Sequence, residues 1–303
     1  MVVLITGANG FVGQYLCEEL SAHDHTVVRT DVLGDVDWKA DLLSEAETVS
    51  LLENASPDAV IHLAGQASVT LSWKKPKWTE TLNVHTTLNL IQAIVQTGRP
   101  VRLLVIGSSD QYGKALQGDR MLDESMPCEP QNPYAVSKLA QEQLALNLAH
   151  HHRLDVLCTR SFNHIGPGQK LGFVVSDFCH GIAAIERGAD SVLKVGNLDV
   201  YRDFTDVRDV VRAYRLLLEK GKSGEVYNVG SGCLVKIAEL LETLVGMSSA
   251  RVQVSVDTGR LRSHDLKHAS CNYQKLKNDT GWVPEIPIHD SLQATLDWWR
   301  AQE

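Results

Sequence analysis

Residues 2–13 read VVLITGANGFVG, an apolar run of strand length that leads directly into glycines and the start of a helical pattern. Gly7, Gly10 and Gly13 have the spacing of a turn that joins a first strand to a first helix around a dinucleotide. Gly7 permits the tight turn, Gly10 lets backbone N–H groups approach a pyrophosphate, and Gly13 allows close helix packing. We therefore predict a dinucleotide site at the N-terminus of the helix near Phe11, with a merely structural turn as the alternative.

The alternation of strand and helix continues through the first half of the chain. Apolar runs of strand length are separated by helical stretches, and their low polar alternation is typical of strands buried on both faces. The strand runs are Val2–Thr6, Thr26–Thr30, Ala59–Leu63, Val101–Ile106 and Leu154–Arg160, and the helical stretches lie near Phe11–Ala22, Ser44–Asn54, Pro76–Thr97 and Pro133–His151. This pattern predicts an α/β fold, a Rossmann-type doubly wound parallel sheet.

After Arg160 the regular alternation loosens into short strands, helices and loops, although Val226–Val229 resembles a further strand of the main sheet. We expect a dinucleotide-binding Rossmann domain over residues 1–161 with about 205–230 added. The remaining segments, about 162–204 and 231–303, then form a smaller, discontinuous C-terminal substrate-binding domain.

The bulk composition limits the functional classes. The chain has 303 residues, 44% of them hydrophobic, and a formal net charge of −8, which argues against a nucleic-acid partner. Its six cysteines are scattered without a C-x-x-C pair, and no long apolar span is visible, so we expect reduced thiols, no membrane partner and a cytoplasmic location. The run His150–His152 lies where a helix ends, and its interaction with the helix dipole is favoured over a metal site.

The type of dinucleotide is indicated by the end of the second strand. Asp31 closes the segment TVVRTD, where a carboxylate can accept hydrogen bonds from a ribose and would repel a 2′-phosphate. This favours NAD(H). Arg29 lies nearby and can accept an extra phosphate, so NADP(H) remains an alternative.

Candidate chemistry lies in the segment YAVSK. Tyr134 and Lys138 are four residues apart and share one helix face. A neighbouring ammonium lowers the pKa of a phenol from its usual value near ~10. We expect Tyr134 to exchange a proton with a substrate oxygen while hydride moves at the adjacent carbon, and Ser108, after the fourth strand, to hydrogen-bond the same oxygen.

The order of these motifs resembles the extended short-chain dehydrogenase/reductase superfamily, in particular its sugar-nucleotide branch of epimerases, 4,6-dehydratases and 4-keto-sugar reductases. HLAG at 62–65, TLNV at 81–84 and NPYAVSK at 132–138 carry the likeness. The resemblance implies a catalytic triad of Ser108, Tyr134 and Lys138, and a structural role for Asn83. It also implies cofactor contacts at Gly7, Asn9, Gly10, Phe11, Val12, Gly13, Asp31, Asp41, Leu42, Leu63, Ala64, Gly65, Asn83, Tyr134 and Lys138, and along the loop at Phe162–Asn163.

Within this branch the chain is most similar to reductases of GDP-linked 4-keto-6-deoxy sugars. The similar segments are LAGQASV at 63–69, RSFNHIGPGQ at 160–169, VGNLDVYRDFTDV at 195–207, VYNVGSG at 226–232 and DTGWVPEI at 279–286. The resemblance implies substrate contacts at Ser109, Asp110, Asn163, Lys170, Val174, Arg202 and Arg260. Arg202 is suited to a diphosphate because a guanidinium forms forked hydrogen bonds, although Asp203 and Asp206 beside it offer a surface ion pair instead. The chain departs from the family at Ser161, where a proline is usual, and only loosely matches it over 260–265.

Asp110 bears on which reaction is catalysed. In GSSDQYG at 107–113 it occupies the position where dehydratases hold a glutamate that removes a proton from C5. Aspartate is one methylene shorter, so its reach as a base is reduced, which favours a reductase. A dehydratase, a 4-epimerase, a loop-capping role for Asp110 and, remotely, a non-catalytic dinucleotide sensor are the alternatives. The family resemblance further implies a homodimer formed by the helices near Pro76–Thr97 and Pro133–His151.

Overall fold

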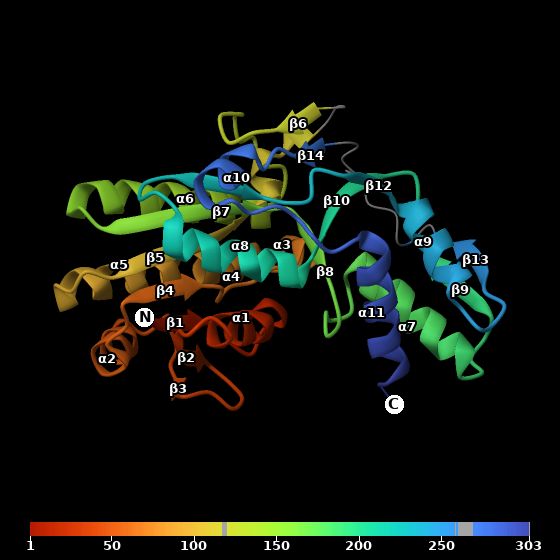
Figure 1. The fold of residues 1–303 in the computed structure, drawn as a ribbon, viewed down its shortest axis with the longest axis horizontal. Coiled ribbons are helices and arrows are strands. Elements are labelled where there is room, and N and C mark those ends of the chain that lie inside the picture. Colours follow the sequence, from red (N-terminus) through yellow and green to blue (C-terminus); the bar gives the residue numbers. More distant parts are fainter. Residues whose placement is uncertain (117–119, 258, 260–268, 303) are drawn as a thin grey trace.

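The main sheet determines where the strand ends meet. The computed structural model describes residues 1–116, 120–257, 259 and 269–302. Seven strands form one sheet in the order β11-β7-β5-β4-β1-β2-β3. Their bounds are Val2–Thr6 (β1), Thr26–Asp31 (β2), Trp38–Lys39 (β3), Ala59–His62 (β4), Arg102–Ser108 (β5), Asp155–Ser161 (β7) and Val226–Val229 (β11). Every pairing in this sheet is parallel, which confirms the predicted doubly wound fold (Figure 1).

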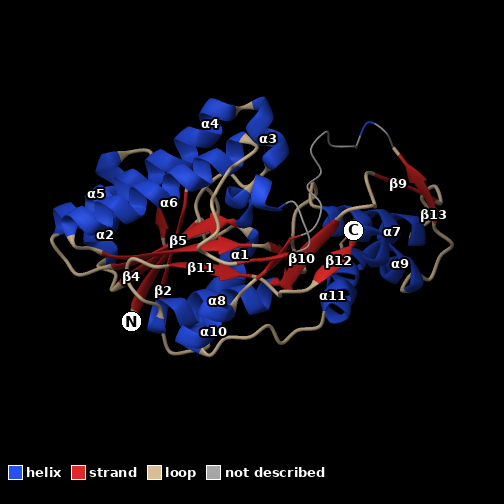
Figure 2. Cartoon of the chain, turned by 90° about the horizontal axis from the view of Figure 1, so that it is seen from above, coloured by secondary structure: helices blue, strands red, loops and turns tan. Residues whose placement is uncertain are grey.

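Helices cover both faces of the sheet (Figure 2). One layer contains α2 (Glu45–Ala55), α5 (Thr86–Thr97) and α6 (Pro133–His152), and the other contains α1 (Phe11–Ser21), α8 (Val207–Lys220) and α10 (Gln274–Thr280). Each layer buries its own apolar core against the strands, as expected for strands that are apolar on both sides. The sheet is therefore shielded from solvent on both faces, and ligands can reach it at the strand ends.

The predicted helix Pro76–Thr97 is interrupted. The structure divides it into α4 (Pro76–Glu80), a π-helical turn η1 (Thr81–His85) and α5, and a short helix α3 (Val69–Lys74) precedes it. The side chain of Asn83, in the π-helical turn, is fully buried and hydrogen-bonds the backbone of Gln66 in both directions. Apolar periodicity is the same on either side of one such turn, which is why the sequence predicts a single helix.

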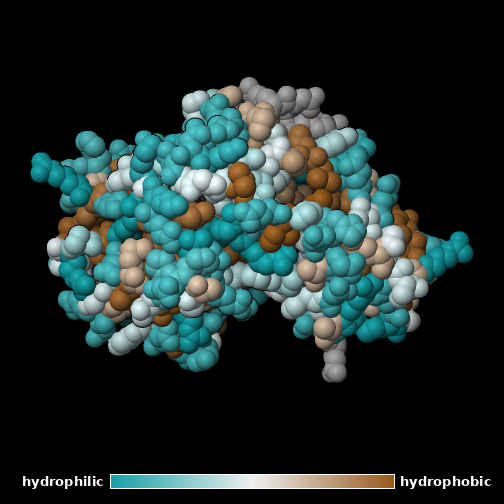
Figure 3. Space-filling model, viewed as in Figure 1, coloured by the Kyte–Doolittle hydropathy of each residue, from teal (hydrophilic) through white to brown (hydrophobic). Residues whose placement is uncertain are grey.

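A second apolar core lies beyond the C-terminal ends of the strands. It is built around α7 (Val174–Glu186), α9 (Ile237–Gly246) and α11 (Ile288–Arg300). A three-stranded sheet of β8 (Asn163–Ile165), β10 (Tyr201–Asp206) and β12 (Leu234–Lys236) connects it to the main sheet, and β9 (Val192–Val195) pairs with β13 (Gln253–Val256). The space-filling view shows a notch along the lower margin of the molecule between the two parts (Figure 3). We propose that this second core is the substrate-binding part.

The described part of the chain contains neither a membrane-spanning helix nor a cluster of metal-binding side chains. No helix there is long and apolar enough to span a membrane. Nor do its His, Cys, Asp and Glu side chains form a group of three or more that could hold a metal ion. All six cysteines carry free thiols.

Candidate functional site

The glycine turn can pack against β4 and begin α1 only because side chains are missing from it. Gly7 has a φ of 70°, and a Cβ atom there would lie 2.9 Å from the backbone nitrogen of Ala64 at the end of β4. A Cβ on Gly13 would lie 2.6 Å from the carbonyl oxygens of Gly7 and Ala8. Gly10 is the N-cap of α1, and no side chain caps that helix end. Its first amides are thus available to an anion, and the turn fits a pyrophosphate.

The adenosine end of this dinucleotide site would lie at the end of β2. The Asp31 carboxylate accepts hydrogen bonds from the backbone nitrogens of Asn9 (3.2 Å) and Val32 (2.8 Å), which ties the glycine turn to the loop after β2. Asp41 is exposed and caps the backbone nitrogen of Leu43 at 2.9 Å, whereas the Leu42 side chain is buried. Both predicted groups therefore border the same loop region as Asp31.

The guanidinium of Arg29 is paired with a neighbouring carboxylate. Its guanidinium forms an ion pair with Asp37, with an Nη2–Oδ1 distance of 3.0 Å, and also donates to the carbonyl oxygen of Asp35. Hydrogen bonds from Arg29 lower the pKa of the Asp37 carboxyl. Acidic residues of the loop after β2 thus hold the side chain of Arg29, which lies on β2 itself.

Ser108 and Tyr134 meet at the C-terminal edge of the main sheet, the candidate catalytic edge. Ser108 is the last residue of β5, and Tyr134 lies in the first turn of α6, which is capped by Asn132 at 2.8 Å and begins with Pro133. Both side chains are buried. Burial raises the pKa of Tyr134, the nearby Asp110 carboxylate raises it further, and a hydrogen bond with Ser108 lowers it. The structure therefore brings Ser108, Asp110 and Tyr134 together.

The raised pKa of Tyr134 differs from the sequence-based expectation that Lys138 would lower it. The Lys138 ammonium donates to the carbonyl oxygen of Ile106 and to Oε1 of Gln141, each at 2.9 Å. Burial lowers the pKa of Lys138 to about 8. Desolvation is thus the main influence on Tyr134, and it favours the neutral phenol. A neutral phenol is the form that can donate a proton.

Gly65 opens the space beside the Lys138 ammonium. A Cβ atom on Gly65 would lie 2.6 Å from Oδ1 of Asn83 and 3.9 Å from Nζ of Lys138. Asn83 also donates to Oγ of Ser137 at 2.9 Å, so it connects the segment after β4 to α6. The structural role predicted for Asn83 agrees with these contacts. Leu63 and Ala64 lie directly before Gly65 and line the turn at Gly7.

Three buried residues that the sequence analysis missed hold Ser108 in place. Gln111 accepts a hydrogen bond from the backbone nitrogen of Ser108 at 2.8 Å and donates to Oε2 of Glu142 at 2.7 Å. Arg160 binds both oxygens of Glu142, at 2.9 and 2.7 Å. An arginine within the apolar run of β7 was the signal that could have revealed this buried ion pair.

The predicted substrate residues lie at the boundary between the two cores. Asn163 is at the start of β8 and donates to the carbonyl oxygen of Asp203 at 3.2 Å, and Arg202 is half-buried on the neighbouring strand β10. The Asp203 carboxylate is engaged by Ser231, Gly232 and Cys271, and Asp206 pairs with Arg208. Ser109 is buried beside Ser108, Lys170 is exposed in the loop after β8, and Val174 begins α7. Arg260 lies outside the described residues.

Ser161, which replaces the proline usual in the family, takes part in a buried cluster of hydroxyl groups. Its Oγ lies 2.7 Å from Oη of Tyr214 and 3.2 Å from Oγ1 of Thr159. Tyr214 faces Tyr134 closely enough to raise its pKa. The departure from the family is therefore accommodated at the edge of the site.

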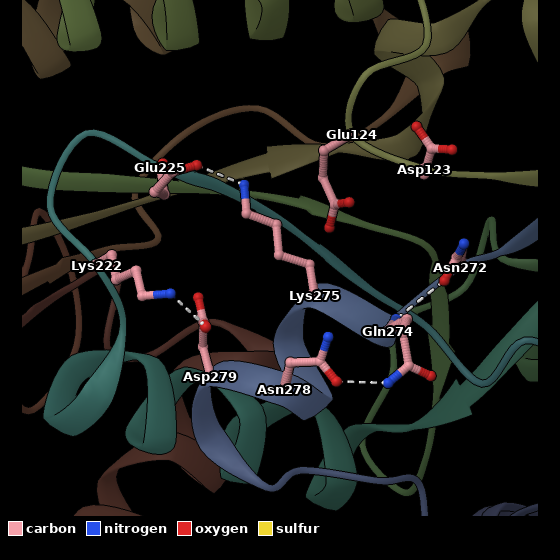
Figure 4. Close-up of a pocket in the computed structure, with 9 residues that line it drawn as sticks. All are labelled: Asp123, Glu124, Lys222, Glu225, Asn272, Gln274, Lys275, Asn278 and Asp279. Carbon is pink, nitrogen blue, oxygen red and sulfur yellow. Dashed lines mark hydrogen bonds and ion pairs between the residues drawn. The ribbon is translucent and has the colours of Figure 1, made fainter.

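A surface pocket of about 320 Å³ lies apart from this arrangement (Figure 4). Its lysines are paired with carboxylates, Lys222 with Asp279 and Lys275 with Glu225, each at 2.6 Å. The lining residues are Asp123, Glu124, Lys222, Glu225, Asn272, Gln274, Lys275, Asn278 and Asp279, and none is a predicted site residue. The candidate site at the strand ends is thus separate from this pocket.

Comparisons with known proteins agree with the geometry. A family model described as GDP-mannose 4,6 dehydratase matches residues 4–295. GDP-6-deoxy-D-mannose reductase of Pseudomonas aeruginosa is 40% identical over 99% of this chain and 97% of the relative. Human dTDP-D-glucose 4,6-dehydratase is 28% identical over 98% of this chain and 89% of its own. The structure of RMD from Pseudomonas aeruginosa complexed with NADPH superimposes with a TM-score of 0.89, at 39% identity and 99% coverage of both chains.

Proposed function

This chain belongs to the GDP-mannose 4,6-dehydratase family, and we propose that it acts there as a reductase of the C4 keto group of GDP-4-keto-6-deoxy-D-mannose. The product is GDP-D-rhamnose or its C4 epimer, GDP-6-deoxy-D-talose. The meeting of Ser108, Tyr134 and Asp110 at one strand end carries the proposal. The likeness to the Pseudomonas reductase supports it, because that relative is 40% identical and the human dehydratase 28%.

The side chains of this site are suited to proton donation. A reduced nicotinamide, when bound, supplies the hydride. Tyr134, kept protonated by its raised pKa, donates a proton to the developing alkoxide at C4. Ser108 holds the same oxygen, and the Lys138 ammonium adds positive charge beside it. Arg202 and Asn163, at the boundary with the second core, bind the diphosphate and so orient the sugar.

Asp110 supports reduction over dehydration. Its carboxylate faces Tyr134 and raises the pKa of the phenol, which favours the proton-bearing form needed by a reductase. A shorter acid than glutamate at this position has less reach toward C5.

The test is incubation of the enzyme with GDP-4-keto-6-deoxymannose and NADH or NADPH. Loss of reduced-nicotinamide absorbance in a one-to-one ratio with product is the expected result. Turnover of a sugar nucleotide without added reductant would instead identify a dehydratase or epimerase.

NADH is the reductant that we propose. Asp31 ends β2 and Asp35 and Asp37 follow in the next loop, where a 2′-phosphate would be expected, and Arg29 is bound to Asp37. This charge arrangement repels a phosphate. The Pseudomonas relative was solved with NADPH, so the comparison of the two reductants is informative. We expect a higher kcat/KM with NADH.

We also propose a homodimer formed through α5 and α6. Val95 on α5, with Val136 and Leu144 on α6, are exposed apolar side chains on the outer layer of helices. Paired helices of this kind bury such residues against a second copy.

A further inference from the structure

A buried chain of hydrogen bonds runs from the catalytic lysine to the strand beneath the glycine turn. Lys138 donates to Oε1 of Gln141 (2.9 Å), and Nε2 of Gln141 donates to Oγ1 of Thr87 (2.6 Å). The Thr87 oxygen lies 2.9 Å from Nε2 of His62, whose Nδ1 lies 2.8 Å from Oγ1 of Thr6. Apart from Lys138, whose exposed fraction is 7%, none of these residues is more than 1% exposed.

The donors and acceptors fix the orientation of Gln141. An ammonium has only donors, so Gln141 must present its oxygen to Lys138 and its NH2 group to Thr87. The Thr87 hydroxyl donates to the carbonyl oxygen of Asn83 at 3.1 Å, so His62 donates from Nε2 and accepts from Thr6 at Nδ1. Burial lowers the pKa of His62 to about 3, so its ring is neutral. Rotation of the Gln141 amide would break hydrogen bonds at both of its ends.

We propose that Gln141, supported by Thr87 and His62, is a positioning residue for the reduction, which holds the Lys138 ammonium in place at the catalytic edge and keeps it charged. The inference rests on the proposed function for its catalytic consequence. The Lys138 ammonium donates hydrogen bonds to two acceptors, and both are neutral: the carbonyl oxygen of Ile106 and the amide oxygen of Gln141. Burial opposes the charged form, so each acceptor contributes to keeping the proton.

Among Lys138 and the groups that face it, we expect Lys138 to titrate near neutral pH. Cys158 faces it from β7 and His62 from β4, and Tyr134 lies one turn earlier on its own helix. Burial raises the pKa of Cys158 and of Tyr134, so both are protonated and uncharged. Asp110, on the turn after β5, is directed at Tyr134. The charged side chains of α3 and α4, which also pack on α6, are exposed.

The experiment measures the titration of Lys138 directly. The full-length protein is labelled with [ε-¹³C]lysine, and the Lys138 resonance is assigned by its loss in Lys138→Met. Gln141→Leu removes the acceptor and should lower the titration midpoint by about one pH unit, which equals about 1.4 kcal/mol. Gln141→Glu places a carboxylate beside the ammonium and should raise the midpoint by a similar amount.

Activity provides the second measurement. Reduction requires the ammonium, so kcat falls as the pH rises through the pKa of Lys138. This alkaline limit should move to lower pH in Gln141→Leu and to higher pH in Gln141→Glu. Gln143→Leu, an exposed position on the same helix, is the matched control and should shift neither the resonance nor the limit.

A midpoint that stays constant in both Gln141 variants overturns the proposal, even if kcat falls, because a merely structural role predicts that result. If Gln141→Leu does not fold, Thr87→Val removes the support behind Gln141 and should lower the midpoint by a smaller amount. An unchanged midpoint in Thr87→Val would also overturn the proposal. The NMR titration needs no substrate. Failure of the proposed reduction is therefore distinguishable from failure of this inference.

Discussion

Tyr134 combines burial with a direct link to Ser108, and its hydroxyl is the proton donor of the proposed reaction. Tyr134→Phe removes that hydroxyl and retains the ring that fills the site. We expect kcat to fall by about 10²–10⁴-fold, the range typical of a general acid, while NADH binding remains nearly unchanged. Steady-state kinetics and calorimetric titration with NADH measure the two effects. Turnover like that of the wild type would refute the role of Tyr134.

The ion pair with Asp37 determines whether the Arg29 guanidinium can bind another anion, such as a 2′-phosphate. The two side chains form an exposed ion pair at 3.0 Å. Asp37→Asn removes the carboxylate, so Arg29 can turn toward a 2′-phosphate. We expect the ratio of kcat/KM for NADPH to that for NADH to rise by about fivefold at most, because an exposed ion pair contributes little free energy.

Asp58→Asn, which changes a carboxylate that binds the backbone nitrogen of Val2 at the opposite end of the strands, is the matched control. It should leave the ratio unchanged. An unaltered ratio in Asp37→Asn would mean that Arg29 plays no part in the choice of cofactor.

At the scale of elements, Glu186 joins the ends of three helices in the second core. From the end of α7 it binds Arg300 of α11 at 2.8 Å and accepts from the backbone nitrogen of Ser249, after α9, at 2.9 Å. Hydrogen bonds from Arg300 lower the pKa of Glu186 to about 2. Because the pKa in the folded state is lower than in the unfolded chain, the charged form stabilises the fold above about pH 4.5, and this stabilisation is lost as the pH falls toward 2.

Glu186→Gln should therefore lower the free energy of unfolding at pH 7 by about 1.5–3 kcal/mol, the usual worth of hydrogen bonds to a charged group. The difference from wild type should shrink as the pH falls below 4.5. Urea denaturation followed by tryptophan fluorescence, at a series of pH values, measures it. Glu53→Gln is the control: Glu53 is exposed on α2, which packs on the main sheet, and its substitution should have little effect on the free energy of unfolding. A pH-independent difference would contradict the assignment.

The sequence predicted the elements of the main sheet better than the details of the site. Strands that are apolar throughout, such as Val2–Thr6, are recognisable because both faces are buried. The π-helical turn at Asn83 was not predictable, since it depends on hydrogen bonds to Gln66 in a distant segment. Local patterns therefore determined the order of strands and helices, and tertiary contacts determined where a helix is interrupted.

The same distinction applies to the site. The glycine turn, Tyr134 and Lys138 have characteristic spacings along the chain and could be predicted. Arg160, as an arginine in an apolar run, indicates a buried ion pair, but its partner Glu142 could not be identified in advance, because the two lie on different elements and meet only when α6 packs against β7. The pKa of Tyr134 was predicted in the wrong direction, since spacing along a helix indicates a neighbouring charge but not the extent of burial.

At the scale of the whole molecule, the outer layer of helices leaves apolar side chains uncovered. Val136 is 51% exposed on α6, and Leu144, two helical turns further, is 37% exposed. A groove of about 420 Å³ between α2, α5 and α6 is lined by Ile91, Val95 and Leu148. A two-fold symmetric contact would place these residues against their own copies and remove them from water.

Sedimentation velocity of the wild type should show a dimer, and Val136→Glu combined with Leu144→Glu should convert it to a monomer. The two substitutions in each subunit would bring four carboxylates together in the interface, desolvated and without cations. The free energy that this costs is larger than the difference between tight and weak association. Val254→Glu, an exposed valine on β13 in the second core, introduces the same side chain away from these helices and should remain dimeric. A wild type that sediments as a monomer, or a doubly substituted variant that still dimerises, would show that α5 and α6 are not the interface.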